Sequence, residues 1–149
     1  MTAPAAPVGR PRSRAVATWL ALVGGSLGLH RFYLHGGRDV WAWLHPWPTL
    51  VGAYGFWRMR EFGVDDARGA LLVPFLGLML ATTMLQAIVY GLASDERWAA
   101  RHGAAAAAVP RGWLTYIAVI VALAVGTSVT VATIAFTAQR YFESRAGVS

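Results

Sequence analysis

The sequence predicts an all-α membrane protein with four transmembrane helices. Hydrophobic residues make up 56% of the 149 residues and charged residues only 13%, about half the charged share of an ordinary soluble domain. All charged residues fall outside four apolar runs, which cover residues 15–29, 40–57, 69–92 and 113–136. Placing one Arg or Asp at mid-bilayer costs roughly 2.5–3.5 kcal/mol on insertion scales, so hydrocarbon would impose this distribution.

The first run follows residues 1–14, which are rich in Ala, Pro and Arg and which we interpret as a disordered basic tail. A basic segment before an apolar run also describes a secretory signal peptide, but no small-x-small cleavage site follows here. We therefore expect residues 15–29 to form an uncleaved first span, with Arg14 and His30 at its ends.

The second run contains Pro46 and Pro48. In a continuous helix these prolines leave the carbonyls of Ala42 and Leu44 without their usual donors, and lipid cannot replace those donors. We expect this span to be kinked or broken at Pro46/Pro48, with Asp39 capping its start. Whether the run crosses the bilayer completely stays open.

The third and fourth runs are each long enough to cross a bilayer core of about 30 Å. They form a second pair of transmembrane helices within residues 63–138. Between them, Ser94, two acids, a basic last turn and Gly103 together predict a short surface helix over 95–102.

We expect Trp98 of that helix to point into the membrane. A linker at 103–112 follows it, and residues 139–149 are expected to form a C-terminal tail.

The distribution of arginine favours one orientation. With the N-terminus inside, eight arginines lie on the cytoplasmic side and five on the other, so the positive-inside rule places both termini in the cytoplasm. Every basic residue other than His is Arg, while Ala and Gly are abundant, which indicates GC-rich codons and a bacterial source. The predicted location is the bacterial inner (plasma) membrane.

Small residues recur at four-residue spacing in two of the runs. Gly24 and Gly28 do so in the first run, and Ala122 and Gly126 in the fourth. Such a face lets another helix approach closely. We expect these faces to pack against other spans of the chain, a second copy or another membrane protein.

The first glycine pair leads into His30-Arg31-Phe32-Tyr33-Leu34. This stretch resembles the signature turn of the TM-two domain family, a two-span helical hairpin. Residues 14–34 match closely and the resemblance extends to residue 62, although His35 stands where the family usually has Gly. The resemblance implies a hairpin over 15–62 and no reaction. At the end of a span, Arg31 and Tyr33 can hold phosphate and headgroups, so these five residues are expected to anchor the turn there.

His45 is the one ionisable residue deep in an apolar run. It is a candidate intramembrane polar site, for example in a proton relay. The alternative, which we favour, is a neutral ring that bonds a carbonyl freed by the prolines. His30, His35 and His45 together lack the Cys or acidic ligands of a metal site, so we expect no metal.

The sequence contains no Ser/His/Asp or Cys/His set, phosphate loop or intramembrane carboxylate pair, so we expect no catalysis and no cofactor. The net charge of +6 comes from short Arg clusters between apolar runs, which suit anionic lipids rather than nucleic acid. The predicted function is that of a structural or accessory membrane protein. The alternatives are a small transport or channel component using His45, and a membrane-anchored signalling adaptor.

Overall fold

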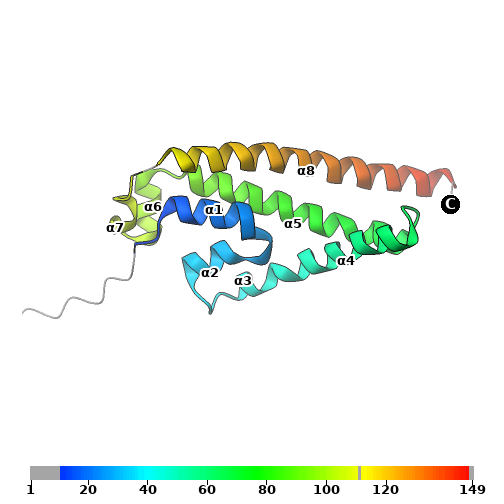
Figure 1. Cartoon of the computed structure of the whole chain (residues 1–149), viewed down its shortest axis with the longest axis horizontal. Coiled ribbons are helices and arrows are strands. Elements are labelled where there is room, and N and C mark those ends of the chain that lie inside the picture. The colour runs from blue at the N-terminus through cyan, green and yellow to red at the C-terminus, as the bar shows by residue number, and fades with distance from the viewer. Residues whose placement is uncertain (1–10, 111, 148–149) are drawn as a thin grey trace, which may run out of the picture.

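The computed structural model describes residues 11–110 and 112–147, and this part of the chain is helical without a strand (Figure 1). Its elements in chain order are α1 (Arg14–Gly24), the 3₁₀-helix η1 (Gly25–Leu27), α2 (Leu29–His35), α3 (Val40–Leu44), α4 (Pro46–Phe62), α5 (Ala67–Leu92), α6 (Asp95–His102), α7 (Ala104–Ala107) and α8 (Trp113–Ala146).

Helix α5 is the centre of the bundle, because α1, α4 and α8 all pack against it. It begins where the Asp66 side chain accepts a hydrogen bond from the Gly69 amide, which satisfies one of the free donors of the first turn. Helices α5 and α8, with 26 and 34 residues, are the two that are long and apolar enough to cross a membrane in the described chain.

The first apolar run does not form one long helix. Helix α1 ends at Gly24, η1 follows, and Gly28 adopts a left-handed conformation with φ +79° before α2 begins. Figure 1 shows α2 running back beside α1 toward the same end of the bundle. With 11 residues, α1 reaches about 16 Å, roughly half of a hydrocarbon core.

The second run is interrupted at His45, directly before Pro46, as expected for a proline-broken helix. His45 keeps helical dihedrals (φ −58°, ψ −42°), so α4 continues the direction of α3. Together residues 40–62 reach about 34 Å. Asp39 caps α3 by accepting from the Trp41 amide, which confirms its predicted role.

Three segment expectations need correction. Arg14 lies inside α1 and is buried, so it is not part of a disordered tail, while residues 1–10 lie outside the described chain. Residues 139–146 are the helical end of α8 rather than a tail. The expected linker contains the short helix α7.

The helix predicted over 95–102 is present as α6, with Ser94 as its cap. Its Trp98, however, is 2% exposed and packs within the protein against Ala17 and Leu34, so it does not point into lipid.

We predict that Gly28→Ala destabilises the fold by at least about 1–2 kcal/mol, the cost of a left-handed Ala. A Cβ at Gly28 would also collide with the backbone carbonyl of Ala42. Gly147, the C-cap of α8, has the same left-handed conformation (φ +69°, ψ 15°) with open space around it, so Gly147→Ala isolates the backbone term. Thermal unfolding in detergent measures both, and equal losses would show that the contact with α3 contributes nothing.

Candidate functional site

The signature turn lies at the end of the bundle where α1 begins and α5 ends. His30 and Leu34 are buried, and Leu34 packs in a cluster with Ala17, Trp98 and Ala106. These two side chains face the protein interior, where headgroups do not reach. Of the five signature residues, only the three between His30 and Leu34 keep part of their surface exposed.

Tyr33 holds the segment that precedes α1. Its hydroxyl accepts a hydrogen bond from the Ser13 amide at 2.8 Å, and the Trp98 indole N–H donates to the Arg12 carbonyl at 3.1 Å. Arg14 Nη2 donates to Asp95 Oδ1 at 2.7 Å. The first two bonds fasten the chain before α1 to α2 and α6, and the third joins the start of α1 to α6.

Arg31 forms an ion pair with Asp39, with Nε 2.8 Å from Oδ2. His35 Nδ1 lies 3.7 Å from the same oxygen. The Arg31 hydrogen bond, more than any other contact, holds the pKa of Asp39 below its ordinary value. One carboxylate thus caps α3 and joins the end of α2 to it.

His30 and His45 lie close together, with ring centroids 5.5 Å apart and edge to face. The Nδ1 atom of His45 is 2.6 Å from the Trp41 carbonyl oxygen, which can only accept, so Nδ1 carries the proton. Both ring nitrogens of His30, and Gln86 Oε1, are buried without a partner among the described residues. The fully buried imidazole is therefore His30, while His45 is half-exposed.

The glycines expected to form packing faces have different surroundings. Gly24 and Gly28 lie at the ends of η1, against Leu29 and the Ala42 carbonyl, and not on one continuous helix. In α8, Ala122 is buried in a cluster with α1 and α5, and Gly126 lies against Met84 of α5.

Sequence reasoning missed Gly52 and Gly55 of α4. Added side chains there would overlap Leu76 and Leu72 of α5, so these glycines set the α4–α5 distance. Their three-residue spacing within the second run was the available signal.

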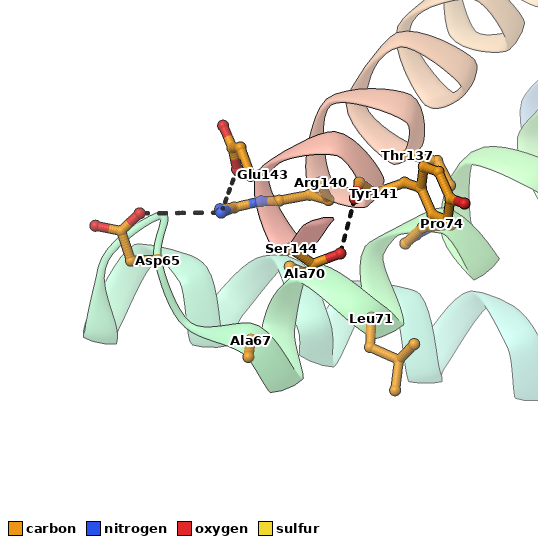
Figure 2. A pocket seen from close by; sticks show the side chains of 10 residues that line it. All are labelled: Asp65, Ala67, Ala70, Leu71, Pro74, Thr137, Arg140, Tyr141, Glu143 and Ser144. Carbon is orange, nitrogen blue, oxygen red and sulfur yellow. Dashed lines mark hydrogen bonds and ion pairs between the residues drawn. The ribbon is translucent and has the colours of Figure 1, made fainter. Parts of the chain in front are cut away.

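Two cavities carry charged side chains. One, of about 480 Å³, lies between the start of α5 and the end of α8. Figure 2 shows its single cation, Arg140, reaching toward Asp65 at 3.9 Å and Glu143 at 3.1 Å. Arg140 therefore has two carboxylates of the same protein within ion-pair distance.

The other cavity, of about 410 Å³, lies at the opposite end, beside the signature turn. Five of its lining side chains are basic: Arg12, Arg31, His35, Arg101 and His102. We call these five residues the basic pocket. They come from the segment before α1, from α2 and from α6, so the chain must fold before they meet.

Among the described residues no group of three or more His, Asp or Glu side chains is arranged to hold a metal ion. No family model, curated protein or solved structure matches the chain.

The hairpin between α4 and α5 is closed by a two-pronged ion pair. Arg58 Nε and Nη2 donate to the two carboxylate oxygens of Asp66 at 2.8 and 2.9 Å. The Arg58 hydrogen bond is the main reason that the pKa of Asp66 lies below its ordinary value of 3.8. A bidentate pair of this kind fixes orientation as well as distance.

Acid should loosen this hairpin. Because the pKa of Asp66 is lowered on folding, its contribution is present above pH 3.8 and is lost as the pH falls below that value. We predict that wild-type stability falls in this range and that Asp66→Asn, already weaker at neutral pH, falls less. The neighbouring Asp65 is almost fully exposed, so Asp65→Asn serves as control and should retain the wild-type acid response in thermal unfolding.

Proposed function

We propose that this chain is an integral membrane protein with a structural or accessory role and no catalytic activity. One observation carries the membrane assignment: the outward faces of α5 and α8 are covered by large apolar side chains. Leu71 is 72% and Ile120 65% exposed, and many similar residues accompany them along both helices. Water-soluble proteins rarely expose continuous apolar surface on this scale.

The core helix of a soluble protein is the alternative for any long apolar helix, and burial argues against it. Only 17% of the most apolar stretch of α5 and 22% of that of α8 lie buried within the protein. Their close contacts instead use Gly, Ala and Thr, as in membrane helix packing. Arg-only basic composition supports a bacterial plasma membrane.

We propose three crossings, made by α3–α4, α5 and α8, in place of the four-span arrangement that the apolar runs suggest. Helix α1 covers about half of the core, and α2 returns to the end where α1 began. Residues 14–35 then form a re-entrant helical pair, and the glycines of its irregular turn, Gly24, Gly25 and Gly28, are buried, as non-helical backbone at membrane depth must be. This arrangement puts the two termini on opposite sides of the membrane, whereas four spans put both in the cytoplasm.

The TM-two resemblance remains a proposal for residues 14–62. The first and second apolar runs pack as neighbours through Gly28 and Ala42, which supports a hairpin-like unit whose first arm, in the three-crossing arrangement, is re-entrant and does not span. The Thr49 hydroxyl adds a hydrogen bond to the Ser26 carbonyl at 2.7 Å across the same contact. The partners that we propose are lipid and either a second copy or another membrane protein.

A small transport component is the second candidate, and the buried His30 favours it. Broken helices and ionisable groups at membrane depth are features of transporters. The polar groups near His30 are few, namely His45, Gln86 and Tyr90. We therefore rank packing above transport.

Sidedness tests the proposed membrane arrangement. The chain has no Cys, so single cysteines placed before Met1, at Gly37→Cys and at Val64→Cys can each be labelled alone. In oriented membrane vesicles we expect the first two to react with a membrane-impermeant maleimide from one side and Val64→Cys from the other. Labelling of the first two cysteines from opposite sides of the membrane would instead support four crossings. Release of the chain by alkaline carbonate would refute membrane integration altogether.

His30→Leu separates packing from transport. Replacing a buried, unpartnered imidazole with an apolar side chain should leave the thermal unfolding temperature unchanged or raise it, because a desolvated polar group is removed. His45→Leu is the matched variant, and should lower that temperature because it loses the bond to Trp41. A lower thermal unfolding temperature for His30→Leu, together with lost proton flux in reconstituted vesicles, would favour the transport function.

A further inference from the structure

The basic pocket concentrates cationic side chains with few acids to balance them. Its lining residues include three arginines and no carboxylate. Arg12 and Arg101 have no carboxylate partner among the described residues, and Arg31 has Asp39 alone. The bond to Asp39 uses Arg31 Nε, which leaves the two Nη groups of that side chain for a ligand.

The pKa of His102 is affected by the positive charge of this pocket. Its Nδ1 atom is buried without a partner in the described chain, and its ring lies 4.4 Å from the Trp98 ring. Burial lowers the pKa of His102, and the positive charges of Arg12, His35 and Arg101 lower it further. A group pushed toward its neutral form by surrounding cations marks a place where an anion would be stabilised.

We propose that the basic pocket binds the phosphate group of an anionic membrane lipid. Several guanidinium groups converging on one cavity suit phosphate, because each planar fork donates paired hydrogen bonds to its oxygens. At about 410 Å³ the cavity is large enough for a small ligand such as a lipid headgroup. Basic pockets between membrane helices recognise lipid headgroups in this way.

The position of the pocket selects a lipid as the source of the phosphate. Tyr90 lies in the last turn of α5, and α6 follows directly, so the pocket is at the level where α5 leaves the bilayer. That is the headgroup level, and this step rests on the proposed membrane location.

The opposite cavity gives a contrast within the same molecule. It is slightly larger, but Arg140 lies between Asp65 and Glu143 (Figure 2). An anion entering there would meet two carboxylates. Size alone therefore does not distinguish the two cavities, and charge does.

The test is titration of the full chain in detergent with short-chain phosphatidylglycerol, with bound lipid measured by native mass spectrometry. We expect Arg12→Gln/Arg101→Gln to weaken binding at least about tenfold, through loss of charge-assisted hydrogen bonds. The control Arg60→Gln/Arg68→Gln removes the same charge at the far end of the bundle, and should stay within about twofold of wild type.

Equal affinities of the two double variants would overturn the proposal. So would displacement of the lipid by inorganic phosphate at comparable concentration, which would make free phosphate the ligand. Circular dichroism of the double variant Arg12→Gln/Arg101→Gln and of each single variant separates lost binding from lost folding. Carbonate extraction tests membrane integration independently. Release of the chain by carbonate would refute the membrane location but not the pocket's affinity for anions.

Discussion

The close contact of small side chains with α5 is the constraint on which the bundle depends. Hydrocarbon gives apolar helices no reason to leave it, so association requires dense van der Waals contact between helix surfaces. Gly52 and Gly55 bring α4 onto one side of α5, and Gly126 brings α8 onto another. Large apolar residues remain on the outside, where the proposed membrane location would give them contact with lipid rather than a core.

Polar side chains are concentrated where the helices end. Asp39 and Asp66 each cap a helix while also pairing with an arginine on a neighbouring element. Arg14 performs the same joining role through Asp95. Each end of the bundle is therefore tied by directional bonds, while the middle is held by shape. Some buried polar atoms have no partner in the described chain, among them both ring nitrogens of His30.

The helical class and the positions of α5, α6 and α8 could be predicted from the sequence, because charge exclusion and capping residues are local signals. So could the interruption before Pro46. The first apolar run was misleading. Its composition fits a span, but Gly28 ends it in a left-handed turn that packs closely against the Ala42 carbonyl, a contact that the local sequence does not reveal. A four-residue glycine spacing describes a packing face only if the helix continues, and here it stops at Gly24.

The hydrogen bond between Ser13 and Tyr33 joins residues 20 positions apart, and the basic pocket brings together three separate segments of the chain, so no local pattern contains them. In Figure 1, α1, α2 and α3 accompany α5 and α8 over one half of the bundle, while α4 alone accompanies them over the other. Surrounded by a bilayer, such a body displaces more lipid area from one leaflet than from its opposite. In the proposed membrane location, this unequal number of helices along the bundle favours a curved bilayer over a flat one.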